Sequence, residues 1–181
     1  MNERILIAGF GGQGALTAGQ LIASLYLNRG VNVTWMPSYG AEMRGGTANC
    51  SVIASDGVIG SPIVSANAGI VMALNSPSLD KFEPVAAPGG TVILNTSIVT
   101  RGLKRGDVKS IKIDASNIAV NELKNIKVAN MVMLGAYLTL HPEFTDDEIE
   151  RVLNDRFGAK AAALIPLNMK AIASGKANAA R

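Results

Sequence analysis

The chain contains very little cysteine and histidine. Among its 181 residues there is one cysteine, Cys50, and one histidine, His141. One cysteine cannot form an internal disulfide, and it cannot supply the ligands of an iron–sulfur cluster or a zinc site. Because Cys50 lies in an apolar run, we expect it to be a small buried residue. We expect His141, a lone histidine before Pro142, to be structural.

Charge and aromatic side chains are also sparse. Charged residues make up 17% of the chain, below the typical quarter, and aromatic residues make up 4%. The net charge is +3, and no dense basic patch with interleaved aromatics is present, so we expect no nucleic-acid partner. There is no apolar run of membrane-spanning length and no signal-peptide pattern. We therefore expect a cytoplasmic protein that does not contact a membrane.

Hydrophobic residues, by contrast, make up 48% of the chain. A chain so poor in charge and rich in apolar residues is expected to bury more surface than its own core needs. A subunit interface would supply that burial, because obligate interfaces resemble a core cut in half. The alternative is a compact α/β domain whose strands are buried on both faces.

Apolar periodicity predicts one α/β domain over residues 1–181. Strands are expected at 4–8, 31–35, 48–54, 69–74, 91–95 and 111–113, and helices at 18–25, 130–137, 145–158 and from 166 onward. Thr145 and Glu148 have the spacing of a capping box. We expect a Rossmann-like fold with a mostly parallel sheet flanked by helices and a helical C-terminal third. The first two strands should pair in parallel through a right-handed crossover.

The segment between the first strand and the first helix is a glycine loop. It reads Gly9-Phe10-Gly11-Gly12-Gln13-Gly14, which satisfies the G-x-G-x-x-G pattern. In such loops the first glycine permits a tight turn, the second lets a ligand approach and the third allows close helix–strand packing. The helix N-terminus favours an anion, and we expect exposed N–H groups from Gly11 to Gly14.

A nicotinamide or flavin dinucleotide would need an acidic residue about 20 residues after this loop. There the chain reads Val33-Thr34-Trp35-Met36-Pro37, and the first acid is Glu42. We therefore expect weak or absent NAD(P) binding. The glycines would then serve a tight turn and close packing, against a partner subunit for example, or an anion site for another phosphate.

The segment Pro37–Thr47 is the most informative part of the sequence. It follows the second strand, whose C-terminal end should face the crevice of an open parallel sheet, so both segments should lie at the same sheet edge. Arg44 offers a planar fork for carboxylate or phosphate, and Gly45 and Gly46 permit close approach. An exposed Glu42–Arg44 pair, the alternative reason for this composition, would contribute only about 0–1 kcal/mol. The candidate ligand or interface residues here are Ser38, Tyr39, Glu42, Arg44, Gly45, Gly46 and Thr47.

Taken together, these segments resemble the gamma subunits of 2-oxoacid:ferredoxin (acceptor) oxidoreductases. The resemblance covers essentially the whole chain and is most specific in the segment that follows the second strand. It is closest to the 2-oxoglutarate and branched-chain 2-oxoacid types. The matching residues are Ile7–Gly14, Pro37–Gly40, Glu42–Cys50, Gly60–Pro62, Ala73–Asn75, Pro77–Leu79 and Asn130–Ala136.

The resemblance implies oxidative decarboxylation of pyruvate, ketoisovalerate, 2-oxoglutarate or another 2-oxoacid to acyl-CoA and CO2, with electrons passing to ferredoxin. It implies that thiamine diphosphate, Mg and iron–sulfur clusters belong to alpha, beta and sometimes delta partner subunits. This chain would hold no cofactor, would be inactive alone and would help to bind the co-substrate coenzyme A. When isolated it could also form a homodimer. The alternatives are an independent nicotinamide-dependent dehydrogenase and a non-catalytic α/β scaffold.

Overall fold

The computed structural model describes residues 1–40 and 46–180, and only the backbone of 159–161. In these residues a sheet of six strands has the order β2-β3-β1-β4-β5-β6. The strands are β1 (Asn2–Phe10), β2 (Asn32–Tyr39), β3 (Thr47–Ser55), β4 (Ala68–Ala73), β5 (Ala86–Asn95) and β6 (Lys109–Ile113). All six predicted strands are confirmed.

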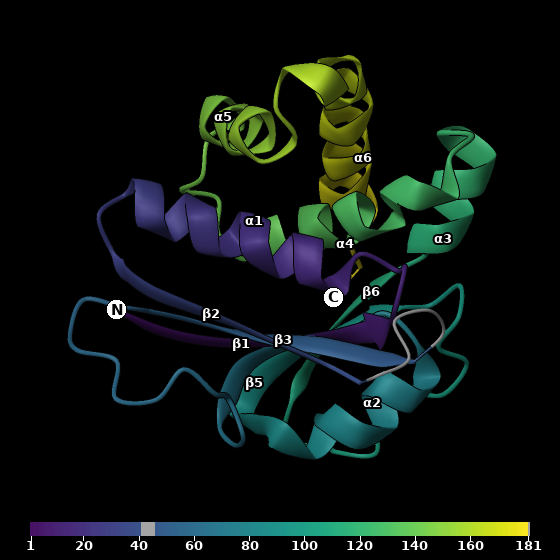
Figure 1. Cartoon of the computed structure of the whole chain (residues 1–181). Coiled ribbons are helices and arrows are strands. Elements are labelled where there is room, and N and C mark those ends of the chain that lie inside the picture. The colour runs from purple at the N-terminus through teal and green to yellow at the C-terminus, as the bar shows by residue number, and fades with distance from the viewer. Residues whose placement is uncertain (41–45, 181) are drawn as a thin grey trace.

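The helices lie on both faces of this sheet, α1, α4, α5 and α6 on one side and α2 on the other (Figure 1). They are α1 (Ala15–Asn28), α2 (Ser76–Phe82), α3 (Ala115–Asn117), α4 (Ala129–Leu138), α5 (Asp146–Phe157) and α6 (Ile165–Asn178). Shorter turns are η1 (Glu83–Val85), η2 (Ile118–Glu122), η3 (Ile126–Val128) and η4 (Ala159–Leu164). The α/β fold with a helical C-terminal third is therefore confirmed.

The sheet is mixed because β3 runs against its neighbours. β1, β4, β5 and β6 pair in parallel, whereas β3 pairs antiparallel with β1 on one side and with β2 on the other. Thr47 is opposite Phe10, and Ala48 is opposite Tyr39. The expected direct pairing of the first two strands is wrong, because β3 folds back from β2 and occupies the position beside β1.

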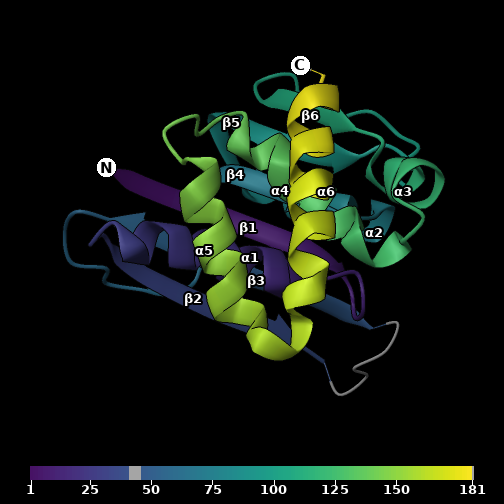
Figure 2. The ribbon, with the colours of Figure 1, turned by 90° about the horizontal axis from the view of Figure 1, so that it is seen from above.

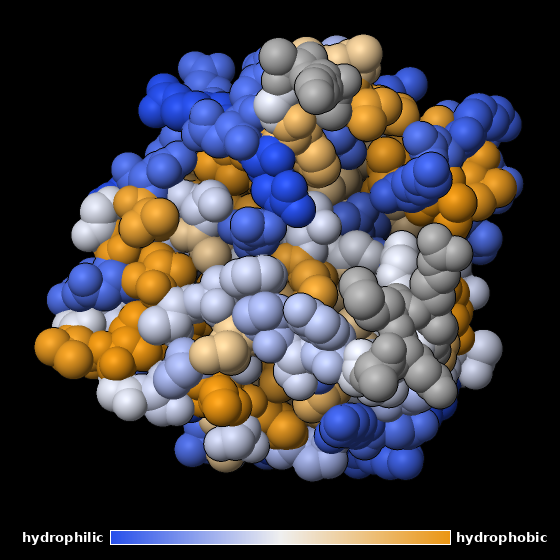
Figure 3. Space-filling view, in the orientation of Figure 1, coloured by the Kyte–Doolittle hydropathy of each residue, from blue (hydrophilic) through white to orange (hydrophobic). Residues whose placement is uncertain are grey.

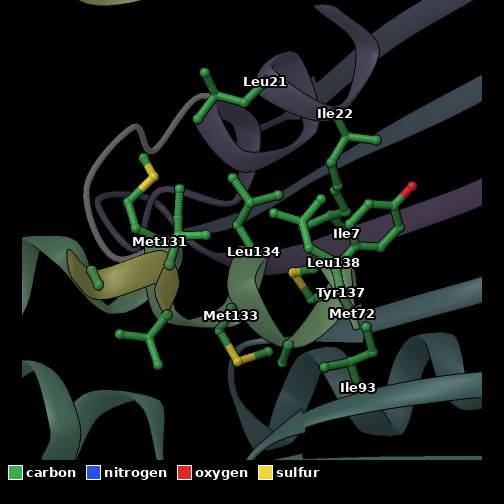
Figure 4. Packing of buried hydrophobic residues seen from close by; sticks show 14 of the residues in the cluster. Ile7, Leu21, Ile22, Met72, Ile93, Met131, Met133, Leu134, Tyr137 and Leu138 are labelled. Carbon is green, nitrogen blue, oxygen red and sulfur yellow. The ribbon is translucent and has the colours of Figure 1, made fainter. Parts of the chain in front are cut away.

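Alternate residues of the buried strands fill two cores, one on each face of the sheet. In β1, Ile5 and Ile7 pack under the larger helical layer, whereas Leu6 and Ala8 pack on the α2 side. Figure 4 shows Ile7 close to side chains of α1 and α4 in the larger core. This alternation is the period-2 pattern of a strand buried on both faces.

The outer helices α5 and α6 lie across α1 and α4 (Figure 2). Gly135 of α4 and Gly175 of α6 meet at the closest point, where a Cβ on Gly135 would lie 2.1 Å from the carbonyl oxygen of Ile172. The two backbones are therefore in direct contact. At the start of α5, the predicted capping box of Thr145 and Glu148 is present, and the space-filling view shows hydrophilic side chains gathered over this helix (Figure 3).

The one cysteine and the one histidine of the chain are both buried among residues of the larger core. Cys50 is fully buried, and burial raises the pKa of its thiol to about 12, so it is inert as a nucleophile. His141 is buried beside Tyr26, Tyr137 and Phe144, with Nδ1 3.3 Å from the Tyr26 hydroxyl. Within the described ranges, no helix is long and apolar enough to cross a membrane.

Candidate functional site

The glycine loop between β1 and α1 is held in shape by a side-chain amide. The Gln13 Oε1 atom accepts hydrogen bonds from the Phe10 backbone N–H and from Asn75 Nδ2, both at 2.7 Å. Asn75 is fully buried and caps α2, where its Oδ1 accepts from the Ser78 N–H at 2.9 Å. Gln13 therefore joins the loop to the connection between β4 and α2.

Gly14 ends the loop in a left-handed conformation, with φ 78° and ψ 17°. A Cβ at this position would lie 2.4 Å from Nδ2 of Asn130, whose Nδ2 donates to the Gly14 carbonyl at 3.3 Å. The third glycine of the motif thus allows contact with α4, where the sequence predicts contact with a strand. Asn130 lies in the first turn of α4.

The backbone donors of the loop are only partly available to a ligand. Gly11 N–H donates to the Gly46 carbonyl at 2.8 Å, and Gln13 N–H donates to the Phe10 carbonyl at 3.0 Å. The expected row of exposed donors is therefore wrong at these two residues. The N–H groups of Gly12 and Gly14 have no hydrogen-bond partner among residues 1–40 and 46–180. They add to the unpaired donors of the first turn of α1.

A cavity of about 660 Å³ lies beside the loop; we call it the glycine-loop cavity. Its size falls within the usual range for ligand pockets. It is bounded by the ends of β1 and β2, the start of β3, the first turns of α1 and the last turn of α5. Its lining comprises Phe10, Gly11, Gly12, Gly14, Ala15, Leu16, Thr17, Gln20, Trp35, Pro37, Tyr39, Gly46, Thr47, Ala48 and Arg156.

A smaller cavity of about 190 Å³ lies on the other side of Gly12, where the chain crosses from one face of the sheet to the other. We call it the switch-point cavity, because α1 and α2 leave β1 and β4 on opposite faces there, as Figure 1 shows. In open α/β sheets ligands bind at this place. Its lining comprises Gly12, Gln13, Leu74, Asn95, Ile98, Ser116, Ile126, Lys127, Ala129 and Met133.

Among residues 1–40 and 46–180, no acidic side chain lines either cavity. Among the described residues, Arg156 is the one charged residue that lines the glycine-loop cavity, and Lys127 is the one that lines the switch-point cavity. In the same part of the chain, no group of three histidine, cysteine or acidic residues could hold a metal ion. This arrangement of the described residues is suited to holding an anionic ligand.

The structure brings both predicted segments to one edge of the sheet, as expected. Gly11 is bonded to Gly46, and residues of both segments line the glycine-loop cavity. Gly9 and Ser38 lie within strands, and Tyr39 ends β2, where the sequence predicts a loop. Thr47 begins β3. Glu42, Arg44 and Gly45 lie outside the described residues.

Several residues of the site have no local sequence pattern that marks them. Arg156 comes from the end of α5, and Asn130 comes from α4. Trp35 belongs to β2 and, like Phe10 and Tyr39, supplies an aromatic surface to the cavity. Because these residues are far from the glycine loop along the chain, short sequence motifs cannot predict that they lie beside it.

The basic cluster of the sequence, at Arg101, Lys104 and Arg105, belongs to another part of the molecule. Arg101 pairs with Asp80 and with the buried Glu83, each at 2.8 Å. Glu83 also accepts from the backbone N–H groups of Lys104 and Arg105. These partners hold the pKa of the Glu83 carboxyl below its usual value, although burial opposes them. The cluster therefore ties the loop after β5 to α2 and η1.

Comparison with known proteins gives one family for nearly the whole chain. Residues 4–177 match the family described as pyruvate ferredoxin/flavodoxin oxidoreductase. The chain is 35% identical over 173 residues to ketoisovalerate oxidoreductase subunit VorA of Methanothermobacter thermautotrophicus. This alignment covers 95% of this chain and 35% of VorA. It is 35% identical over 159 residues to 2-oxoglutarate synthase subunit KorC of Methanocaldococcus jannaschii, covering 86% and 83%.

Solved structures agree with these sequence matches. The gamma subunit of the keto/oxoacid ferredoxin oxidoreductase from Geobacter sulfurreducens superposes with a TM-score of 0.80 and 29% identity, over 96% of this chain and 95% of that one. A 2-oxoglutarate:ferredoxin oxidoreductase from Magnetococcus marinus, solved with 2-oxoglutarate, coenzyme A and succinyl-CoA, gives a TM-score of 0.84 at 27% identity. The match covers 97% of this chain and 30% of that one, so this chain spans about a third of the longer relatives.

Proposed function

Because the chain belongs to the pyruvate ferredoxin/flavodoxin oxidoreductase family, we propose that it is the gamma subunit of a multi-subunit 2-oxoacid:ferredoxin oxidoreductase. The enzyme would decarboxylate a 2-oxoacid, pass electrons to ferredoxin and transfer the acyl group to coenzyme A. The observation that carries this proposal is the near end-to-end match to a separate gamma subunit, together with similarity to subunit KorC over most of both chains.

In this enzyme the chain would not hold the redox cofactors. Its one cysteine is buried in the core and cannot ligate an iron–sulfur cluster. In the described part of the chain, the two cavities offer no acidic side chain for the Mg²⁺ that accompanies thiamine diphosphate. We assign thiamine diphosphate, Mg²⁺ and iron–sulfur clusters to alpha, beta and, where present, delta partners. This chain would pack against those partners beside the reacting carbon.

The contribution of this chain would be to help bind coenzyme A. The acceptor carries several phosphates, and the described residues that line each cavity include one cationic side chain and no acidic one. The free N–H groups of Gly12 and Gly14, with the first turn of α1, add to the positive potential. Arg44 remains part of this proposal as a second cation or as a contact with a carboxylate of a partner subunit.

The dehydrogenase alternative is not favoured by the topology. In a dinucleotide-binding fold the second strand lies directly beside the first, and its terminal acid reaches the ribose. Here β3 occupies that position, and the Gly11 N–H already donates to Gly46. A nicotinamide dinucleotide therefore lacks both its ribose partner and one of its phosphate donors.

The test is to purify the complex from its native source by a tag on this chain. We expect co-purification of alpha and beta partners and reduction of ferredoxin that requires both a 2-oxoacid and coenzyme A. A panel of 2-oxoglutarate, ketoisovalerate and pyruvate identifies the substrate, and the chain alone should show no turnover. Turnover by the isolated chain, or its isolation without partners, contradicts the proposal.

A further inference from the structure

The strand β2 forms an open edge of the sheet. It lies at the end of the strand order and pairs with β3 on its inner side. The Asp56 N–H, just past the end of β3, donates to the Met1 carbonyl, so the even-numbered residues of β3 turn their backbone groups toward β1 and the odd-numbered residues toward β2. In the β2–β3 register these odd-numbered residues face the even-numbered residues of β2. Val33 and Trp35 therefore point their N–H and C=O groups outward, where they have no hydrogen-bond partner among residues 1–40 and 46–180.

The two edges of the sheet differ in how they are protected. Exposed edge strands usually carry lysine or proline, or are covered, because their free backbone groups pair with other chains. β6 carries Lys109 and Lys112, and Lys112 exchanges backbone hydrogen bonds of 2.7 and 2.9 Å with Ala180. β2 has no charged residue, and its one proline, Pro37, lies near its end. Figure 3 looks onto the β2 edge and shows mainly pale and orange residues across its middle and lower part.

Exposed apolar side chains flank the first half of this edge. At its start, the Asn32 Nδ2 atom donates to the Gly57 carbonyl at 3.1 Å, which places Val58 beside Asn32. The Val58 side chain is 98% exposed. Four residues after Asn32, the Met36 side chain is 40% exposed. An apolar residue therefore lies near each end of the segment 32–36.

We propose that β2 pairs with β2 of a second copy of this chain, in an antiparallel arrangement about a two-fold axis at Thr34. Val33 of one copy would lie opposite Trp35 of the other, and these two residues would exchange both of their backbone hydrogen bonds. A register that places Pro37 inside the pairing leaves a carbonyl of the facing strand without a donor, because proline has no N–H. The axis at Thr34 keeps Pro37 beyond the paired residues.

Two features of the edge favour a second copy over a different partner. In a two-fold interface each residue meets the same patch of the other copy, so a strand without charge avoids the repulsion of like charges. In this register Asn32 of one copy lies opposite Met36 of the other, which brings the exposed Val58 to the exposed Met36 at both ends of the pairing. This dimer goes beyond the proposed function, because it would join the gamma subunits of two enzyme units.

The first experiment is a disulfide cross-link in the full chain. Thr34 would face its own copy as a non-hydrogen-bonded pair, with Cα atoms about 4.5 Å apart, a separation that a disulfide spans. Thr34→Cys should therefore give a covalent dimer on mild oxidation, and the buried Cys50 should not interfere. Asn32→Cys is the matched control, because the two copies of this exposed residue would lie roughly 14 Å apart. Absence of the Thr34→Cys dimer, or equal cross-linking of Asn32→Cys, would overturn the proposal.

A second pair of variants tests the backbone hydrogen bonds. Because the Val33 N–H points outward, Val33→Pro removes a donor of the edge and leaves the β2–β3 hydrogen bonds intact. Val33→Ala loses similar packing but keeps the N–H group. In sedimentation experiments Val33→Pro should dimerise roughly five- to hundred-fold more weakly than Val33→Ala, the range for one hydrogen bond lost in each copy. Equal dimer affinities, with both variants folded by circular dichroism, or a wild-type chain that stays monomeric at millimolar concentration, would contradict the pairing.

The assembled complex separates this dimer from the proposed function. Oxidation of a Thr34→Cys complex should link two gamma chains while 2-oxoacid oxidation continues, a result that supports both. An active complex in which the cross-link is absent, or joins this chain to an alpha or beta subunit, keeps the function and removes the dimer. A cross-linked pair of chains that purifies without partners and without activity keeps the dimer and removes the function.

Discussion

Substitution of Gly14 by alanine should destabilise the protein for two separable reasons. The backbone at Gly14 has φ 78°, a left-handed conformation that costs a residue with a Cβ about 1–2 kcal/mol. The new methyl group would also lie 2.4 Å from Asn130 Nδ2 and 2.7 Å from Asn130 Cγ. Overpacking of this kind costs about 1–3 kcal/mol. The expected loss in the free energy of unfolding is therefore about 2–5 kcal/mol.

Two further variants divide this loss into its parts. Gly12→Ala has a similar backbone requirement, with φ 98°, but a Cβ there meets no atom within 4 Å, so it should show the backbone cost of about 1–2 kcal/mol alone. Asn130→Ala removes a buried amide together with its 3.3 Å hydrogen bond and should cost about 1–3 kcal/mol. The double variant Gly14→Ala/Asn130→Ala removes the two shortest contacts of the new methyl group, those with Asn130 Nδ2 and Cγ. Its loss in the free energy of unfolding should therefore be about 1–3 kcal/mol smaller than the sum of the two single losses.

Urea unfolding followed by circular dichroism measures all four variants, with equal m-values required for the comparison. Additive effects of Gly14→Ala and Asn130→Ala would show that the Asn130 side chain does not pack on the loop. Equal losses for Gly12→Ala and Gly14→Ala would show the same. Either result would refute the explanation of the third glycine given above, because that explanation depends on close approach of α4.

Three other predictions concern the scaffold. The Arg29 guanidinium lowers the pKa of Glu148 to about 2 from a usual 4.5. The free energy of unfolding should therefore fall as the pH drops from 4.5 toward 2. Urea unfolding at pH 5 and pH 3 measures this fall, which should be smaller for Glu148→Gln than for the wild-type chain. Glu83→Ala leaves Arg101 without its buried partner and should cost about 3 kcal/mol in chemical unfolding. Asp107→Ala breaks an exposed pair with Arg105 and should cost less than about 1 kcal/mol. Gly135→Ala places a Cβ against backbone and should cost at least about 2 kcal/mol in thermal melts, a loss that an unchanged melting temperature would rule out.

The strands could be predicted from the sequence because apolar runs bounded by glycine and proline are a local property. Their ends could not. The strand β5 begins at Ala86 and runs through Pro88, Gly89 and Gly90, residues that usually end a strand. A register shift between β4 and β5 takes place here, and a Cβ on Gly90 would lie 2.9 Å from the Ala87 carbonyl. The glycines permit an irregular strand start, which a propensity scale cannot distinguish from a loop.

The glycine loop itself was also predictable, but what surrounds it was not. Its first partner, Asn75, follows β4, its second, Asn130, lies in α4, and the cation beside it, Arg156, ends α5. Each of these contacts joins residues far apart in the sequence, so only the tertiary fold brings them to the loop. Arg156 in particular has the pattern of a solvent-exposed residue near a helix C-terminus, a position where arginine is common without any ligand.

The position of β3 decides how the glycine motif should be interpreted, and one feature of the sequence could have located it. A parallel crossover between neighbouring strands needs about a dozen residues or more. The strand ending at Tyr39 and the strand starting at Thr47 are joined by residues 40–46 alone. They must therefore run antiparallel, as a hairpin, whereas the helix α1 makes β2 parallel to β1.

Within this hairpin, β3 could lie in either of two places, outside β2 or between β2 and β1. The apolar sequence of β3, most of whose residues are buried, favours the inner place, because an edge strand such as β2 has no fully buried residue. With β3 inside, the G-x-G-x-x-G pattern keeps its local geometry but loses the neighbouring strand that dinucleotide binding requires.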